Sequence, residues 1–233
     1  EGIETTTCPL GQGIANAVGM ALAMHHMADR FNRDDLKLVD HNIYVIASDG
    51  DLMEGVSHEA CSLAGHLGLS RLIVLYDDNH ITIDGSTDLA YTEATLLRFE
   101  SYGWHTLRVD GHDPDAVRAA IAEAREVKDK PVIIACRTVI GFGSPNKAGT
   151  AKVHGEPLGE EEIKKTKENL GLPQEAFYVP DDVKAFYEES TERGKQKRQQ
   201  WEATWRQYQE KYPEEAAAWK AAQACTLPEG WDA

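Results

Sequence analysis

The residues best suited to chemistry come directly after two apolar runs. Asp49 and Gly50 follow residues 44–47, and Asn79 closes a run that begins at residue 72. If the two runs form neighbouring parallel strands, their carboxyl ends meet at one edge of a sheet, where such folds bind ligands. Carboxylate and amide oxygens are hard donors that suit Mg²⁺, especially beside a phosphate. The spacing therefore indicates a magnesium and phosphate site.

Two readings of the acidic turn follow from the residues alone. Asp and Gly are common in turns, so Asp49 and Gly50 also fit an ordinary turn that caps a helix. In the functional reading, Gly50 lets the backbone approach a ligand closely, and the amides of the next helix face a phosphate. A carboxylate and a phosphate need a counter-charge to share a site, which implies a divalent cation.

Strand-like and helix-like segments alternate along the first 140 or so residues, each with its own apolar period. We expect helices at residues 14–31, 54–67, 93–102 and from 114 onward, and strands at residues 43–47, 72–76, 104–109 and 131–139. Asp113 is the expected N-cap of the helix that begins at Pro114. This alternation predicts an α/β fold: a doubly wound, mainly parallel sheet with helices on both faces, plus a helical C-terminal extension.

Two helical faces can be assigned from apolar periodicity. In the helix at residues 54–67, the expected buried face consists of Val56, Ala60, Leu63, Ala64 and Leu67. Beyond residue 158 the chain is charged and helical, and an aromatic stripe there consists of Trp201, Trp205, Tyr208 and Tyr212. We interpret the stripe as a packing face, because its members are spaced for one side of a helix.

Composition limits the classes of function. The 233 residues carry a net charge of −15 from 39 acidic and 24 basic residues, which argues against nucleic acids or anionic membranes as partners. The four cysteines form no CxxC pair, so a cytoplasmic location is the default. Apolar runs stay below the ~18 residues of a membrane span. Because the sequence opens directly into motif-like residues, without the features of a signal peptide, we expect it to be part of a longer protein.

The flanking sequence narrows the chemistry further. The pattern "SDGD…YDDN" resembles the thiamine-diphosphate signature. Six segments resemble transketolases in that family's order: "ETTTCPLGQGIANAVGMALA", "DLMEGVSHEACSLAGHLGL", "DDNHITIDG", "YGWHTLRVDGHD", "IGFGSPNKAGTAKVHGEPLG" and "LPEGW". The resemblance covers nearly the whole chain. It implies thiamine diphosphate and Mg²⁺ (or Ca²⁺ or Mn²⁺) as cofactors.

The resemblance also implies roles for single residues. Asp49 and Asn79 would coordinate the metal through their side chains and Ile81 through its backbone carbonyl. The Gly50 amide would meet the diphosphate. His154 would reach both the diphosphate and the reacting sugar, as the catalytic residue of this chain, although Ala151 replaces a histidine that several relatives carry.

Further cofactor contacts are implied near the start of the chain and after the acidic turn. Cys8, Pro9 and Leu10 match a segment that touches the cofactor rings, where many relatives have glycine in place of Cys8. Glu54 matches a glutamate at a dimer interface that links the cofactor sites. Equally, Glu54 could simply favour the N-terminus of a helix.

The family's activity is the transfer of a two-carbon ketol unit from a ketose phosphate to an aldose phosphate. By this resemblance, residues 1–157 are an N-terminally incomplete diphosphate-binding core. Residues 158–233 are a helical extension and linker toward an absent pyrimidine-binding domain. The implied partners are sugar phosphates and either a second copy of the protein or a complementary pyrimidine-binding domain. We expect this chain alone to be inactive, because the glutamate that activates the cofactor belongs to that domain.

Three other readings remain open from the sequence. One is a related thiamine-diphosphate enzyme: dihydroxyacetone synthase, phosphoketolase or deoxyxylulose-phosphate synthase. Another is a non-catalytic or split-subunit module that binds the cofactor. The third is a magnesium phosphatase that uses Asp49 and Asp51, although the spacing to Asn79 gives it no support.

Overall fold

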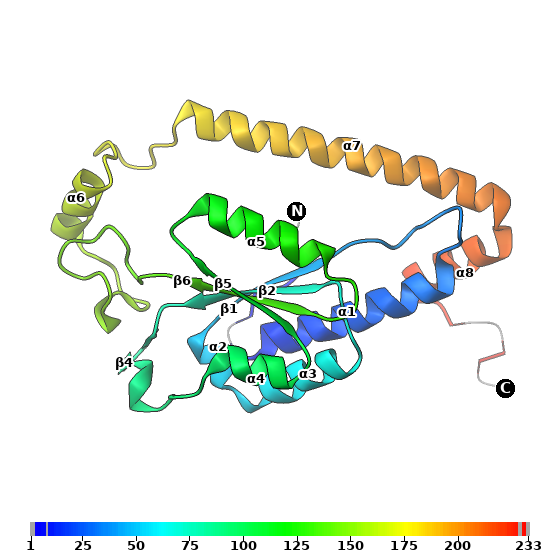
Figure 1. The fold of residues 1–233 in the computed structure, drawn as a ribbon. Coiled ribbons are helices and arrows are strands. Elements are labelled where there is room, and N and C mark those ends of the chain that lie inside the picture. The colour runs from blue at the N-terminus through cyan, green and yellow to red at the C-terminus, as the bar shows by residue number, and fades with distance from the viewer. Residues whose placement is uncertain (1–2, 8, 228–229, 232–233) are drawn as a thin grey trace. The chain divides into compact units, whose positions relative to one another are not determined.

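The chain folds into two compact units, which are described separately. The computed structural model describes residues 3–7, 9–227 and 230–231 (Figure 1). The first unit comprises Glu1–Ala23 and His41–Glu175, and the second comprises Met24–Asp40 and Ala176–Ala233. The long helix α1 (Gln12–Phe31) contributes residues to both.

A four-stranded parallel sheet is the centre of the first unit. Its order is β1-β2-β6-β5, formed by β1 (Ile43–Ser48), β2 (Leu72–Asp78), β6 (Val132–Arg137) and β5 (His105–Asp110). Ser48 pairs with Asp77, so the carboxyl ends of β1 and β2 lie side by side. A short antiparallel pair, β3 (Ile81–Thr82) and β4 (Gly85–Ser86), follows β2. The predicted parallel sheet is confirmed.

Helices cover both faces of this sheet. The helices of this part of the chain are α2 (Asp49–Met53), α3 (Gly55–His66), α4 (Thr95–Ser101) and α5 (Pro114–Glu126), with a short 3₁₀ turn η1 (Thr87–Leu89). The 3₁₀ turn η2 (Ala151–Val153) and α6 (Glu160–Asn169) follow β6 in the chain. In Figure 1, α5 lies on one face of the sheet, and α3 and α4 lie on the other. The expected doubly wound α/β arrangement is therefore confirmed, with α2 as an additional short helix directly after β1.

The packing of α5 shows how its sequence directs the chain onto the sheet. The Asp113 carboxylate accepts hydrogen bonds from the Asp115 and Ala116 amides at 2.9 and 3.1 Å, which confirms the predicted N-cap. One turn later the small residues Ala120 and Ala124 are buried in a cluster with apolar side chains of β2 and β6. Small side chains at these positions allow the helix to lie close to the strands.

Of the face predicted for α3, Ala64 is buried and Ala60 is half-buried, but the prediction was wrong for Val56, Leu63 and Leu67. Ser57, Cys61 and Ala64 are the buried residues of this helix, whereas Val56, Leu63 and Leu67 are exposed. The reason is close contact with Tyr102, the C-cap residue of α4: a Cβ atom added to Gly65 would lie only 1.8 Å from its carbonyl oxygen. A face pressed so closely against backbone accepts only small side chains, so apolar periodicity gave the wrong side.

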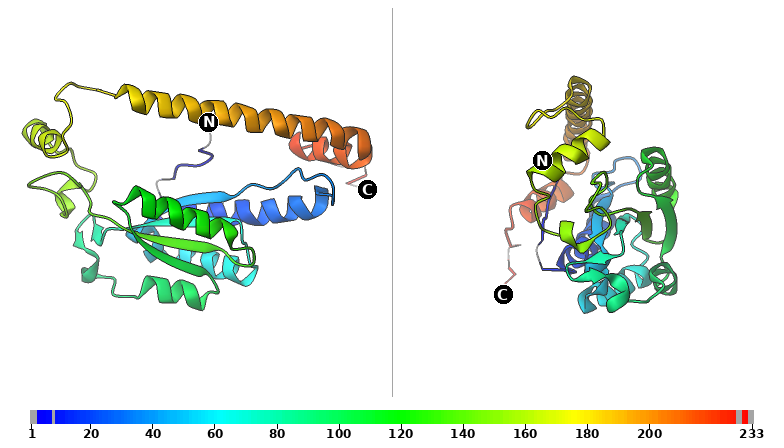
Figure 2. Two further views of the ribbon diagram at one scale, coloured as in Figure 1. Left: turned by 45° about the horizontal axis from the view of Figure 1, so that its top comes forward. Right: turned by 90° about the vertical axis from the view of Figure 1, so that its left-hand side faces the viewer.

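The second unit contains α7 (Asp181–Lys211) and α8 (Pro213–Gln223). The helices separate at Tyr212 because Pro213 begins the second one, and α8 folds back along the end of α7 (Figure 2). Trp201, Trp205 and Tyr208 stack at ring centroid distances of 6.1 and 6.0 Å. Trp201 and Trp205 also contact Trp219 of α8, which confirms the stripe as a packing face.

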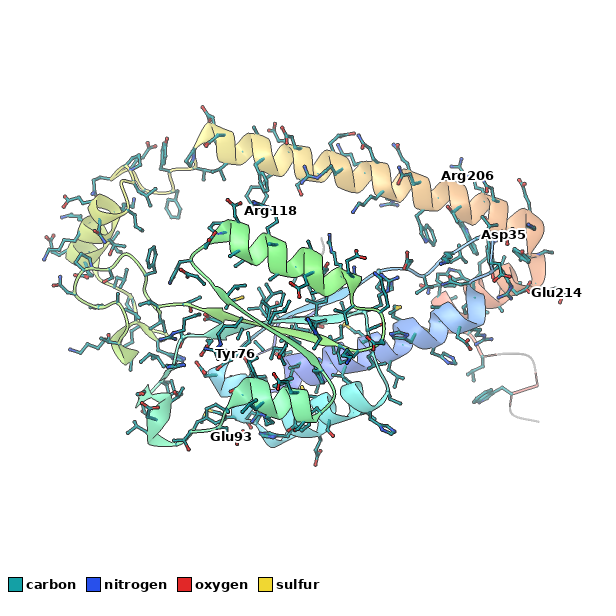
Figure 3. All side chains as sticks on the ribbon, viewed as in Figure 1. Asp35, Tyr76, Glu93, Arg118, Arg206 and Glu214 are labelled. Carbon is teal, nitrogen blue, oxygen red and sulfur yellow. The ribbon has the colours of Figure 1, made fainter. Side chains whose placement is uncertain are left out.

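Polar contacts complete the second unit. The Tyr208 hydroxyl donates to the Phe31 carbonyl oxygen at 2.7 Å. Asp35, labelled in Figure 3, accepts from the side chains of Lys211 and Tyr212.

By packing, α6 and the residues to Glu175 group with the sheet. The predicted domain division at residue 157 stays a prediction. Every helix in the described part of the chain is too short or too polar to cross a lipid bilayer.

Replacement of Tyr208 by Phe should destabilise the second unit. Tyr208 is fully buried, so the substitution leaves the Phe31 carbonyl without its donor, a loss of about 1–3 kcal/mol. Urea unfolding measures the change. Tyr187→Phe is the control: Tyr187 is an exposed residue of the same helix, and its change should stay within ~0.5 kcal/mol. Equal effects of the two variants would contradict the assigned hydrogen bond.

Candidate cofactor site at the carboxyl ends of two strands

Asp49 is the first residue of α2 and lies where β1 ends. Its side chain is among the most deeply buried in the protein, with the residue 2% exposed. One carboxylate oxygen, Oδ1, accepts a hydrogen bond from the Tyr76 hydroxyl, and the other, Oδ2, accepts from the His80 amide at 3.0 Å. Both donors belong to β2 or the residues just after it, so the carboxylate joins the ends of the two strands.

Backbone conformation at the end of β2 makes this contact possible. His80 has φ = 60°, in the left-handed region that residues other than glycine rarely occupy. Just before it, the Asn79 side-chain oxygen Oδ1 accepts from the Ile81 amide at 2.9 Å, and Nδ2 donates to Asp77 at 3.0 Å. The amide oxygen keeps a second lone pair for another ligand.

The predicted metal ligands Asp49, Asn79 and Ile81 are thus gathered around one turn. This set contains a single carboxylate, an amide and a backbone carbonyl. Among the described residues, no group of three or more His, Cys, Asp or Glu side chains could hold a metal ion. A site at this turn would therefore depend on neutral oxygens and on phosphate oxygens, and metal binding here stays a prediction.

The electrostatics of the turn favour a cation. Asp78, only 3% exposed, lies near Asp49, with the Tyr76 hydroxyl 3.4 Å from Asp78 Oδ1 (Figure 3 labels Tyr76). Burial raises the pKa of Asp49, although the hydrogen bonds from Tyr76 and His80 oppose the shift. Asp78 has His80 Nε2 at 2.9 Å and Arg108 at 3.8 Å as partners. A hard divalent cation at Asp49 would offset the burial of its charge, so the residues fit Mg²⁺.

Leu10 lies against the acidic turn. A Cβ atom on Gly50 would lie 3.2 Å from Leu10 Cδ1, so Leu10 would have to shift slightly to admit any other residue there. The Pro9 carbonyl accepts from the Gln12 amide at 3.3 Å as the chain enters α1. The structure therefore brings two of the segments predicted to touch the cofactor together. Cys8, the first residue of the segment that contains Pro9 and Leu10, lies outside the described residues.

Glu54 occupies the junction of α2 and α3. It is exposed, and its carbonyl accepts from the Ser57 amide at 3.0 Å in the first turn of α3. A carboxylate at this position is favourable to the helix dipole. The alternative role of Glu54 at a dimer interface stays a prediction.

His154 follows η2 in the long loop after β6, and its side chain is exposed. Neighbours on both sides of it are held by the earlier part of the loop. A Cβ atom on Gly141 would lie 3.0 Å from Val153, and Lys147 Nζ donates to the Leu158 carbonyl at 2.8 Å. The loop backbone around His154 is therefore fixed at two points.

Glu162 of α6 anchors this loop. Its carboxylate accepts from the Ser144 hydroxyl and from both the backbone and side-chain amides of Asn146, the latter two at 2.9 Å. Hydrogen bonds from the Asn146 side chain, then Ser144 and the Asn146 amide, lower the pKa of Glu162 from 4.5 to about 2. The anchor is therefore an ionised carboxylate with three donors directed at it.

Comparison with known proteins decides the family. Residues 1–228 match the family model described as "Transketolase, thiamine diphosphate binding domain". The chain belongs to the transketolase family. It is thus a thiamine-diphosphate-binding domain of that family, and the family resemblance predicted from its motifs is confirmed.

Individual transketolases agree along almost the whole chain. The chloroplastic transketolase of Solanum tuberosum is 53% identical over 233 residues, and the transketolase of Nostoc sp. is 54% identical over 233 residues. A transketolase structure from Leishmania mexicana superimposes with a TM-score of 0.95 at 47% identity. These matches cover 99% of this chain but only 31–35% of the relatives. The chain therefore spans about a third of the length of the transketolases it matches.

Sequence reasoning missed two residues of the turn, Tyr76 and His80. Both donate to Asp49. Tyr76 could have been found from its position two residues before Asp78, because alternate residues of a strand share one face and both side chains therefore point the same way. The role of His80 depends on a backbone amide and a left-handed φ, which side-chain types do not reveal.

Acid should weaken the loop anchor. A carboxylate whose pKa is lowered on folding stabilises the protein above its unfolded pKa and loses that contribution as pH falls. For Glu162 the loss should run from about pH 4.5 down toward about pH 2. Thermal unfolding at pH 7 and pH 3 measures it: Glu162→Gln should lower Tm clearly at pH 7 and much less at pH 3. The same Tm difference at both pH values would contradict the anchor.

Gly11→Ala should destabilise the first unit. Gly11 has φ = +77°, and an added Cβ would lie 2.8 Å from both Glu54 Cβ and Ser57 Oγ. Strain of this kind costs about 1–3 kcal/mol. Gly19→Ala is the control: Gly19 lies in α1 with nothing within 4 Å of an added Cβ, so alanine there should stabilise by about 0.5–1 kcal/mol. Urea unfolding compares the two, and equal signs would contradict the packing of Gly11.

Proposed function

We propose that this chain supplies the magnesium- and diphosphate-binding part of a transketolase, which transfers a two-carbon ketol unit between sugar phosphates. The observation that carries the proposal is the buried Asp49 carboxylate, held 3.0 Å from the His80 amide. That contact puts the carboxylate beside the turn that holds Asn79 and Ile81. A cation bound there would offset the charge of an acid that is so deeply buried.

Each residue then has a defined task. Asp49, Asn79 and the Ile81 carbonyl would hold Mg²⁺, which would supply the positive charge needed to bind a diphosphate. Gly50 allows the phosphate to approach the backbone, and His154 offers an imidazole toward the diphosphate and the sugar. Thiamine diphosphate supplies carbanion chemistry when it is bound. Tyr76 and His80 orient Asp49 as its outer partners.

Catalysis would need parts beyond this chain. The proposal therefore includes a pyrimidine-binding domain, supplied by a longer form of the protein, as a homodimer, or by another chain. The fact that the chain spans about a third of its relatives supports this requirement. It also favours a second candidate, a cofactor-binding module that is not catalytic by itself.

The phosphatase reading has less support from the geometry. A phosphatase would need the Asp49 and Asp51 carboxylates to face one substrate. Instead, Asp49 accepts from Tyr76 and His80, while Asp51 accepts from Gly11 and Ser48. The two acids serve different partners, so a shared reacting centre is not favoured.

Calorimetric titration of the 233-residue chain tests the site. Thiamine diphosphate should bind with Mg²⁺ and not after chelation of the metal. Asp49→Asn should weaken binding by more than the roughly 10–100-fold that loss of an outer-shell partner costs, and Tyr76→Phe should fall within that range. Asp129→Asn, which removes an exposed acid far along the sequence, should bind as the wild type does.

Activity separates the two candidates. The isolated chain should show no ketol transfer, and addition of a matching pyrimidine-binding domain should restore it if the chain is part of an enzyme. Cofactor binding without restored transfer would favour the non-catalytic module. Binding that ignores Mg²⁺, or is unchanged in Asp49→Asn, would overturn the proposed site.

A further inference from the structure

Asp51 is a second acid in the turn, and its contacts differ from those of Asp49. Its oxygen Oδ1 accepts from the Gly11 amide at 3.1 Å, across 40 residues of sequence. Its other oxygen, Oδ2, accepts from the Ser48 amide at 2.9 Å and the Ser48 hydroxyl at 3.1 Å. One carboxylate therefore links the loop before α1 to the end of β1.

Both ends of this link are fixed by other contacts. The Asp51 carbonyl accepts from the Ser57 hydroxyl at 2.5 Å, which ties α2 to α3. Gly11 is buried against Glu54 and Ser57 so closely that an added Cβ would meet each at 2.8 Å. Because neither end has room to shift, the carboxylate joins two surfaces in a single arrangement.

The link determines where Leu10 lies. Leu10 precedes Gly11 directly, and its Cδ1 is 3.2 Å from the position of a Cβ on Gly50. Leu10 is half-exposed, so an apolar side chain stands at the surface beside the acidic turn. Such a surface suits the apolar ring part of a cofactor whose diphosphate lies at Asp49.

The negative charge of Asp51 lies close to the proposed diphosphate site and is balanced by hydrogen-bond donors. A free carboxylate beside a diphosphate would repel it, but three donors are directed at the oxygens of Asp51. Hydrogen bonds to a charged acceptor are stronger than those between neutral groups. Asn could accept with one oxygen only and would present an amide to the other donors.

We propose that Asp51 is a positioning residue, which holds residues 9–11 against α2 so that Leu10 forms one wall of the cofactor site beside Gly50. The proposal rests on the proposed function for the identity of the cofactor. It assigns Asp51 to the ring end of the site and Asp49 to the metal and diphosphate end. The two acids of the turn should therefore affect different parts of the ligand.

The test compares Asp51→Asn with three variants. Ser48→Ala removes the hydroxyl, and with it one of the three donors to Asp51 and the capping contact to the Asp51 amide. Leu10→Ala removes the wall without the link, and Glu59→Gln removes one exposed negative charge on α3. Two quantities are measured on each 233-residue chain. The first is the exchange rate of the Gly11 amide hydrogen by NMR without ligand; the second is the affinity for thiamine diphosphate and for pyrophosphate, both with Mg²⁺.

Asp51→Asn should keep the local contact to Ser48 and release Gly11, whose amide should exchange at least roughly tenfold faster. Thiamine diphosphate should bind about tenfold more weakly, while pyrophosphate affinity should change less than about threefold. Leu10→Ala should show the same affinity split with normal Gly11 exchange. Ser48→Ala and Glu59→Gln should resemble the wild type in both measurements.

The outcomes separate this proposal from the proposed function. An unchanged exchange rate of the Gly11 amide in Asp51→Asn contradicts the link between Asp51 and Gly11, regardless of the ligand affinities. If thiamine diphosphate and pyrophosphate lose affinity equally, in this variant or in Leu10→Ala, the role of Leu10 as a wall of the cofactor site is contradicted. If the wild type binds neither ligand, the proposed function fails, while Gly11 exchange still decides the link. If Asp51→Asn does not fold, the Gly11 exchange rate and the two ligand affinities are measured on Asp51→Ser and Leu10→Ala instead.

Discussion

The hydrogen bonds that Asp49 accepts from Tyr76 and His80 are the constraint on which the acidic turn depends. They satisfy a carboxylate that the end of β1 places out of reach of water. A buried charge without such donors would be strongly unfavourable. This arrangement requires an unfavourable backbone conformation: His80 is left-handed, and its amide faces the acid.

Acidic residues serve three distinct structural purposes in the first unit. Asp49 collects donors from the neighbouring strand, Asp51 joins two distant segments, and Glu162 gathers the loop after β6 around its carboxylate. In each case the acid accepts from backbone amides as well as from side chains. A chain with a net charge of −15 thus uses some of its negative charge to order loops rather than to bind a basic partner.

β2 and β6 could be predicted because most of their residues are apolar, as strands covered on both faces require. Asp113 followed by Pro114 marked the start of α5 for an equally local reason. From these elements we predicted that Asp49 and Asn79 lie close together, since adjacent parallel strands end at one edge; in the structure Asp49 contacts His80, the residue after Asn79. Local sequence patterns therefore predicted the α/β fold and the place of Asp49 in the turn, but not its partners Tyr76 and His80.

What could not be predicted depends on backbone contacts between distant segments. The link from Asp51 to Gly11 spans 40 residues and uses an amide that every residue except proline has. The five-residue α2 is too short to show a helical period. In α3, the contact of Gly65 with Tyr102 selects small residues for the buried side, against the apolar pattern.

That close approach of α3 and α4 has a genetic consequence. With 1.8 Å between a virtual Cβ of residue 65 and the carbonyl oxygen of Tyr102, no side chain fits without parting the two helices. A glycine codon is converted to another amino acid, or to a stop, by any change at its first or second base. Nearly every missense allele at this codon would therefore separate α3 from α4, although neither helix carries a residue assigned to binding.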